Sequence, residues 1–185
     1  YIVFGDSFDK ELYNLPIKLQ YIKFGTNFDK SIDNLPDNVK FISLGGLYNR
    51  IINKYPDELN EIHYGLKYNR TIDNLPDCVE KIILEHDFDQ EINKLPKSLK
   101  YIKFGESFNK VLHCLPEGLE KIEFTNGYTQ RIINMPNSVK EIIAKPDILF
   151  YIDKIPDSLE TIRWLSSDMT NNIKYLFIFH LLLYL

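Results

Sequence analysis

The sequence predicts a β-rich repeat solenoid in which leucine-rich-repeat-like 20-residue coils form one parallel sheet, with a convex side of 3₁₀, extended or turn structure. Three observations predict it. Isoleucine recurs with a 20-residue period from Ile2 to Ile162, an aromatic residue recurs with the same period from Phe8 to Tyr128, and proline recurs without an insertion or deletion. The repeating prolines are Pro16, Pro36, Pro56, Pro76, Pro96, Pro116, Pro136 and Pro156.

The spacing inside one repeat predicts its local structure. Ile22 and Phe24 are two residues apart, which is the period of a strand with one buried face, so we expect a short strand near residues 20–24. Pro36 ends any helical turn before it, and a 20-residue unit leaves no room for a strand plus a full helix. Both a leucine-rich-repeat arc and a straighter parallel β-helix satisfy this pattern.

Charges predict how the coils stack. In-register stacking places equivalent residues about 4.8 Å apart, where like charges repel. One outward column alternates in sign at every step, and we expect further pairs between Glu61 and Lys81, Lys121 and Glu141, and Lys103 and Glu123. The alternating column is Glu80, Lys100, Glu120, Lys140 and Glu160.

Three further columns suggest how each coil turns. Glycines follow the expected strands, where we expect a positive φ or a tight bend. A partial ladder of asparagine side chains is predicted along the convex edge, formed by Asn14, Asn34, Asn74 and Asn134. Aspartates that recur with the repeat predict turn capping. The glycines are Gly5, Gly25, Gly45, Gly65 and Gly105, and the aspartates are Asp9, Asp29 and Asp89.

Composition excludes several classes of protein. The 185 residues carry 26 acidic and 22 basic side chains, and this acidic balance argues against a nucleic-acid partner. Cys78 and Cys114 are too few for a disulfide framework, which favours an intracellular and cytoplasmic location. Ala144 is the only alanine, so the chain lacks the best helix former. No catalytic or metal-ligand spacing links the four histidines and two cysteines, so we expect no enzyme activity, cofactor or metal.

One unit reads Leu35-Pro36, Val39, Ile42, Leu44-Gly45, Tyr48-Asn49 and Ile52. This pattern resembles the FNIP repeat, a short relative of the leucine-rich repeat found in social amoebae and in large DNA viruses that infect amoebae. The resemblance covers residues 1 to about 164 and implies a host-cell cytoplasmic location if the protein is viral. Some members carry an F-box ahead of the repeats and are thought to select substrates for ubiquitin ligases. The chain begins at Tyr1 in mid-repeat, so we expect an upstream segment.

Five side chains are candidates for binding a protein partner because they project outward from the expected strands: Tyr21, Lys23, Phe41, Tyr101 and Lys103. Aromatic residues on an exposed sheet are common binding anchors. The alternative is that they only pack on one another across the sheet. A separate column of Lys10, Lys30, Arg50, Arg70 and Lys110 favours a solvated face over an anion-binding stripe, since each residue follows Asp or Asn.

The expected domain organisation is a solenoid over residues 1–164 and a degenerate apolar tail or cap over 165–185. The apolar run at residues 173–185 is too short to span a bilayer. It fits a cap on the open end of the solenoid, a membrane-surface or partner contact, or a non-native tail. The leading hypothesis is a monomeric, non-enzymatic scaffold that binds an unknown protein. The alternatives are the substrate-recognition part of a ubiquitin-ligase adaptor and a truncated inactive copy.

Overall fold

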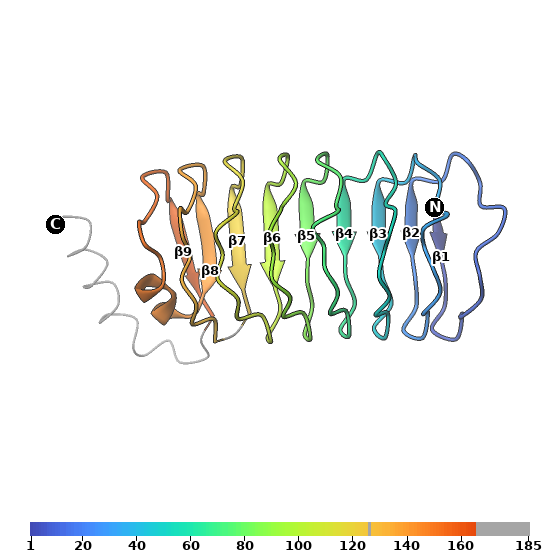
Figure 1. Cartoon of the computed structure of the whole chain (residues 1–185), viewed down its shortest axis with the longest axis horizontal. Coiled ribbons are helices and arrows are strands. Elements are labelled where there is room, and N and C mark those ends of the chain that lie inside the picture. The colour runs from blue at the N-terminus through green and yellow to red at the C-terminus, as the bar shows by residue number, and fades with distance from the viewer. Residues whose placement is uncertain (126, 166–185) are drawn as a thin grey trace.

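The computed structural model describes residues 1–125 and 127–165, which form one nine-stranded sheet with the strands in chain order (Figure 1). Every pair of neighbouring strands is parallel. The strands are β1 (Ile2–Val3), β2 (Tyr21–Lys23), β3 (Phe41–Ser43), β4 (Glu61–His63), β5 (Lys81–Ile83), β6 (Tyr101–Phe104), β7 (Lys121–Phe124), β8 (Glu141–Ala144) and β9 (Thr161–Trp164). The predicted fold class is therefore confirmed.

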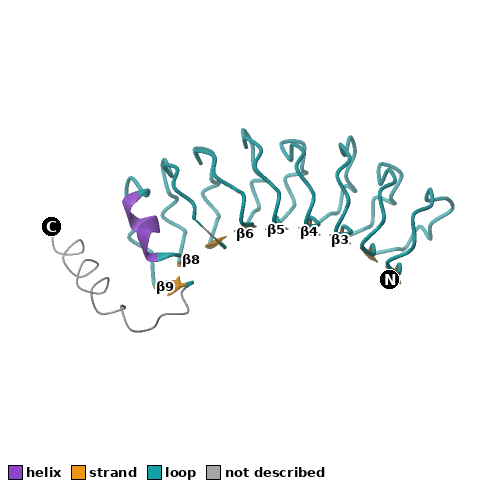
Figure 2. Cartoon of the chain, turned by 90° about the horizontal axis from the view of Figure 1, so that it is seen from below, coloured by secondary structure: helices purple, strands orange, loops and turns teal. Residues whose placement is uncertain are grey.

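The register of the sheet follows the sequence period. Ile2 pairs with Ile22, and the pairing continues in 20-residue steps to Ile142 with Ile162. Turns and extended segments return the chain between strands, and the 3₁₀ helix η1 (Pro146–Phe150) lies between β8 and β9. Figure 2 shows the strands on the inner side of a curved stack, so the described chain is an arc of the leucine-rich-repeat type.

Ring spacing follows the curvature of the stack. On the sheet face, the rings of Tyr21 and Phe41 are 4.3 Å apart. Just beneath the sheet, Phe104 and Phe124 are 5.3 Å apart. Deeper in the core, the rings of Tyr48 and Tyr68 are 6.3 Å apart. The coils therefore splay towards the convex side because bulky rings separate them there, while backbone hydrogen bonds hold the strands close together.

The glycine column serves close approach, and of the two predicted alternatives the glycines adopt the tight bend, as where the N–H of Phe28 donates to the Gly25 carbonyl at 3.3 Å. No glycine among the described residues has a positive φ. A Cβ added to Gly25 would lie 2.4 Å from the Gly5 carbonyl oxygen, and one added to Gly45 would lie 2.0 Å from the Gly25 carbonyl oxygen. Glycine is therefore required at positions 25 and 45, because the backbone of the preceding coil occupies the space that a side chain there would need.

A ladder of Asp and Asn side chains joins successive coils on the other side of the glycine turn. The Oδ1 atom of Asp9 accepts a hydrogen bond from the backbone N–H of Asp29 at 2.9 Å. The same bond recurs from coil to coil as far as Asn109, whose Oδ1 accepts from Thr129 at 2.9 Å. The aspartates therefore cap backbone N–H groups, as predicted, but the capped groups belong to the next coil. The intervening acceptors are Asp29, Asn49, Asn69 and Asp89.

The predicted asparagine ladder on the convex edge is less regular. The Nδ2 group of Asn74 donates to the Ile52 carbonyl at 2.8 Å, and the Cys114 thiol makes the equivalent contact to the Ile92 carbonyl at 3.2 Å. Asn14 and Asn134 instead adopt positive φ values of 53° and 58°. This column thus combines contacts between coils with left-handed turns, for which asparagine is better suited than most residues.

The boundary between solenoid and tail remains a prediction. β9 ends at Trp164, in agreement with the end of the repeat pattern. Residues 166–185, which contain almost all of the expected tail, lie outside the described residues.

The adjacent residues Gly45 and Gly46 provide a direct test of close stacking. We expect Gly45→Ala to destabilise the protein by about 2 kcal/mol or more, because its Cβ would overlap the Gly25 carbonyl. Gly46→Ala should be neutral or stabilising by up to about 1 kcal/mol, since its nearest contact would be the Thr26 methyl group at 3.5 Å. Urea denaturation measures both, and equal effects of the two substitutions would contradict the stacking argument.

Two buried tyrosines should respond in opposite ways to loss of the hydroxyl. The Tyr48 hydroxyl is buried and has no hydrogen-bond partner within the described residues, so Tyr48→Phe should be neutral or stabilising. The hydroxyls of Tyr55 and Tyr64 bond to each other at 2.8 Å, so Tyr64→Phe should cost about 1 kcal/mol. Thermal melts of the two single variants check this order, which the reverse ranking would refute.

Candidate interaction surface

The candidate surface is the sheet face, which two outward columns of side chains cover. Each strand sends its central isoleucine into the core and the residues on either side of it outward, because side chains alternate across a strand. The first column runs Tyr1, Tyr21, Phe41, Glu61, Lys81, Tyr101, Lys121, Glu141 and Thr161. The second runs Val3, Lys23, Ser43, His63, Ile83, Lys103, Glu123, Ile143 and Arg163.

An aromatic pair lies near the N-terminal end of this face. The rings of Tyr21 on β2 and Phe41 on β3 stack in parallel, with an interplanar angle of 1°. His63 contacts Phe41 edge-on, at a centroid distance of 5.0 Å. Lys23 lies on the same strand as Tyr21, is exposed, and makes no ion pair with any residue that the structure describes. This part of the face therefore presents apolar surface beside one exposed cation, whose charge helps to lower the pKa of Asp6 without forming an ion pair.

Tyr101 occupies a different environment, inside a polar network on β5 to β7. The ammonium groups of Lys81 and Lys121 lie 5.8 and 5.2 Å from the centre of its ring, within range of a cation–π interaction. Its hydroxyl donates to the Glu123 carboxylate at 2.8 Å. Burial, and then the hydrogen bond and charge of Glu123, raise the pKa of Tyr101. Lys103 lies 3.7 Å from the same carboxylate.

The remaining charges on the face also pair across strands. Glu61 accepts from Lys81 at 2.7 Å and contacts His63 on its own strand. Glu141 pairs with Lys121 at 3.0 Å. These contacts confirm the predicted pairs Glu61 with Lys81, Lys121 with Glu141 and Lys103 with Glu123. From β4 onward, most charged side chains on the sheet face therefore pair with an opposite charge on the same face.

The five predicted site residues thus occupy two places. Tyr21, Lys23 and Phe41 lie together on β2 and β3, whereas Tyr101 and Lys103 lie on β6, three strands further along. Packing on one another, the alternative to binding, is real for the Tyr21–Phe41 pair. What sequence reasoning missed is that lysines flank Tyr101 on both sides, although the in-register column already placed Lys81 and Lys121 beside it.

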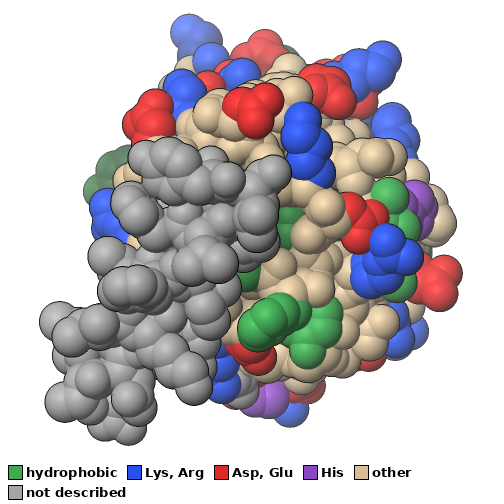
Figure 3. All heavy atoms as spheres, turned by 90° about the vertical axis from the view of Figure 1, so that its left-hand side faces the viewer, with side chains coloured by type: hydrophobic (Ala, Val, Ile, Leu, Met, Phe, Trp, Pro, Cys, Tyr) green, Lys and Arg blue, Asp and Glu red, His purple; other side chains and the backbone are tan. Residues whose placement is uncertain are grey.

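The column of basic residues after the aromatic position pairs with the Asp ladder. Lys30 lies 2.9 Å from Asp9, and Lys110 lies 3.0 Å from Asp89, each one coil earlier. Figure 3 shows charges of both signs interspersed around the β9 end of the molecule. Local pairing therefore favours the solvated face over an anion-binding stripe.

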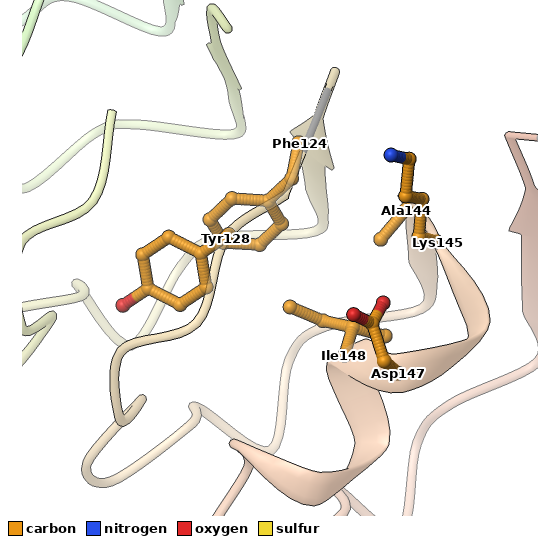
Figure 4. Close-up of a pocket in the computed structure, with 6 residues that line it drawn as sticks. All are labelled: Phe124, Tyr128, Ala144, Lys145, Asp147 and Ile148. Atoms are coloured by element: carbon orange, nitrogen blue, oxygen red, sulfur yellow. The ribbon is translucent and has the colours of Figure 1, made fainter. Parts of the chain in front are cut away.

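A small hollow lies beneath β8 and η1. It is lined by Phe124, Tyr128, Ala144, Lys145, Asp147 and Ile148 and leaves no room for a water-sized molecule (Figure 4). Ala144 stands where the preceding coils place larger residues such as Phe124 and Phe104, which is why the core is thinner there. Ligand pockets usually measure about 300–1,000 Å³, so this hollow is a packing gap.

In the described part of the chain, the side chains that could catalyse a reaction or bind a metal do not gather at one place. No group of three or more His, Cys, Asp or Glu side chains in this part has the arrangement of a metal site. Burial raises the pKa of the Cys114 thiol, which disfavours the reactive thiolate. Within residues 1–125 and 127–165, no helix has the length and apolar character needed to cross a membrane.

Comparison with known families agrees with this geometry. The model of the FNIP repeat matches residues 13–47, 68–107 and 91–127, which together make up just over half of the chain. The chain belongs to the FNIP-repeat family. The family match includes the coils that carry the Tyr21–Phe41 pair and the Tyr101 network. No curated protein matches the chain.

A solved structure shares the fold of this FNIP-repeat chain. It is described as the crystal structure of CroV588, a novel circular LRR protein structure. The alignment has a TM-score of 0.61 and 23% sequence identity and covers 86% of this chain. The chain spans only 29% of the length of that protein, so the likeness concerns the fold alone.

The paired Glu61 carboxylate predicts a contribution to acid sensitivity. Burial raises the pKa of Glu61, but hydrogen bonds from Lys81 and His63 and their charges outweigh it, so the pKa lies below its ordinary value of 4.5. The stabilisation is present above pH 4.5 and is lost as the pH falls through the lowered pKa. Urea denaturation should show a shallower loss of stability below pH 4.5 in Glu61→Gln than in the wild type. Identical pH dependence would contradict this assignment.

Proposed function

We propose that this FNIP-repeat chain is a non-enzymatic scaffold that binds a protein partner through its sheet face. The observation that carries the proposal is the Tyr21–Phe41 stack, which lies on the outer face of the sheet beside the exposed Lys23. Neighbouring charges on the face form ion pairs with one another, whereas Lys23 forms none with the described residues. An aromatic pair next to one unpaired cation suits a protein surface that offers an apolar side chain flanked by a carboxylate.

The second part of the proposed site is the polar network around Tyr101 and Lys103. Both side chains are fixed by Glu123, so they form a preorganised rim rather than an apolar anchor. Three strand spacings, about 14 Å, separate this rim from the aromatic pair. That distance lies within an interface of standard size, about 800 Å² on each partner.

The scaffold role is supported by the family and by the fold, since FNIP and leucine-rich-repeat-like solenoids are typically non-catalytic. We propose further that the chain acts without a cofactor, as a monomer in the cytoplasm. The partner is a protein, because the acidic chain with formal net charge −4 disfavours nucleic acid.

Replacing both stacked rings tests the proposal. Photo-crosslinking from position 23 in the cells of origin identifies a partner, and calorimetry with that purified partner gives the dissociation constant. We expect Tyr21→Ala combined with Phe41→Ala to weaken binding at least tenfold, which corresponds to about 1.4 kcal/mol.

The matched control is Tyr13→Ala, which removes an exposed aromatic side chain that lies outside the strands. It should leave the dissociation constant unchanged. Equal binding by the double variant and the wild type, or equal losses for the double variant and the control, would refute recognition by the sheet face.

A further inference from the structure

The sheet face has a net charge opposite in sign to that of the whole chain. With histidine counted as neutral, its two outward columns hold five cationic and three anionic side chains, whereas the chain has formal net charge −4. A positive face on an acidic protein attracts acidic partners and disfavours basic ones. The cations are Lys23, Lys81, Lys103, Lys121 and Arg163, and the anions are Glu61, Glu123 and Glu141.

Acidic residues border this face on both sides. The segments that lead into the strands, residues 17–20 and their equivalents at 20-residue steps as far as 157–160, hold nine acidic and five basic side chains. The turns that follow the strands, residues 5–7 and their equivalents as far as 145–147, hold five acidic and two basic ones. A three-residue strand is about 10 Å long and charges act over about 8 Å at physiological salt, so face and borders act separately. An acidic occupant is therefore attracted to the face and repelled from its borders, which directs it across the strands.

Hydrogen-bonding capacity on the face is one-sided in the same sense. Each of its three carboxylates already meets two donors. A lysine ammonium has three N–H donors and a guanidinium has five, so a contact with one carboxylate leaves donors unused. The face therefore suits an occupant that supplies acceptors. Glu61 meets Lys81 and His63, Glu123 meets Tyr101 and Lys103, and Glu141 meets Lys121 and Arg163.

The two exposed cations lie towards opposite ends of the face, Lys23 on β2 and Arg163 on β9. Lys23 lies beside the Tyr21–Phe41 stack and forms no ion pair with the described residues. The Arg163 side chain is 68% exposed and contacts Glu141 only through Nε, at 2.8 Å, among the described residues. Seven strand spacings, about 34 Å along the sheet, separate β2 from β9, which is the length of about ten residues of extended chain.

We propose that the sheet face binds an acidic, extended segment of the partner protein, which crosses the strands from β2 to β9. This inference rests on the proposed function and adds the chemistry and the path of the partner. One carboxylate of the segment pairs with Lys23, and another, about ten residues away, pairs with Arg163. As in the proposed function, an apolar side chain lies on the Tyr21–Phe41 stack.

A single-stranded nucleic acid fits the same face less well. Its backbone carries one negative charge per nucleotide, so phosphates would also lie over Glu61, Glu123 and Glu141. A protein segment can place uncharged residues at these points instead. The stacking of Tyr21 on Phe41 also covers one face of each ring, which leaves less ring surface for a base.

Selection from a display library of random peptides of about twelve residues, with the full chain as bait, tests this inference. We expect the selected peptides to be enriched in Asp and Glu around an apolar residue. Replacing every Asp and Glu of a selected peptide by Asn and Gln should weaken binding at least about tenfold, measured by fluorescence anisotropy. The dissociation constant of the acidic peptide should also rise with salt concentration.

The diagnostic variants remove the two exposed cations. Lys23→Ala and Arg163→Ala should each weaken binding of the acidic peptide at least about threefold, and the two together at least about tenfold. The matched control is Lys18→Ala, because Lys18 is also exposed and forms no ion pair with the described residues, but precedes β2 instead of lying on the face. This control should leave the dissociation constant unchanged.

Equal affinity of the acidic peptide and its Asn and Gln counterpart would overturn the inference. Equal losses in Lys23→Ala and Lys18→Ala, or a selection that yields no peptide sensitive to Arg163→Ala, would also overturn it. Tighter binding of a single-stranded oligonucleotide of about ten nucleotides than of any selected peptide would make nucleic acid the occupant.

These failures are distinguishable from failure of the proposed function. If the acidic segment is wrong but the function is right, binding of the cross-linked partner still depends on Tyr21 and Phe41. If the function is wrong, the variant with both Tyr21→Ala and Phe41→Ala binds that partner as the wild type does. Acidic peptides that remain sensitive to Lys23→Ala and Arg163→Ala then still support recognition of an acidic segment.

Discussion

The rest of the structure depends on one constraint, the close approach of each coil to the coil before it. A glycine without a Cβ lets successive backbones meet, as where Gly45 lies against the Gly25 carbonyl. The parallel sheet and the Asp and Asn ladder then bond the coils on both sides of that contact. Because these contacts repeat with a fixed period, a single insertion would shift every column beyond it out of register. The absence of insertions in the repeat follows from this requirement.

Curvature follows from the same constraint. Hydrogen bonds fix the spacing of the strands, whereas the buried rings behind them need more room, as the 6.3 Å between Tyr48 and Tyr68 indicates. The difference places the sheet on the inside of the arc (Figure 2). Where a ring is replaced by a small side chain, as at Ala144, the core loses volume and a hollow remains. The rings therefore both fill the core and set the curvature of the sheet face.

The fold was predictable because its determinants are periodic, and periodicity is visible in a sequence. The strand at Ile22 and its pairing with Ile42 needed only the 20-residue spacing and the alternation of a strand. The role of Gly45 was not predictable, since a sequence gives no distance to the Gly25 carbonyl. The environment of Tyr101 was missed for a related reason: its contacts depend on how long lysine side chains bend across strands, and many conformers satisfy the same register.

Because the chain contains nine copies of the strand-bearing coil, the residue at each position of the repeat can be compared between copies. The central strand position is isoleucine in every coil, and from β2 to β8 this side chain fills the same buried site. The positions on either side differ from coil to coil, from Tyr21 through Glu61 to Lys121, although the backbone beneath them is the same. The fold therefore constrains them only weakly, beyond the requirement that neighbouring charges pair. Their identities can therefore vary without disturbing the fold, and the proposed binding site uses this freedom around Lys23, where a stacked aromatic pair lies beside an exposed cation.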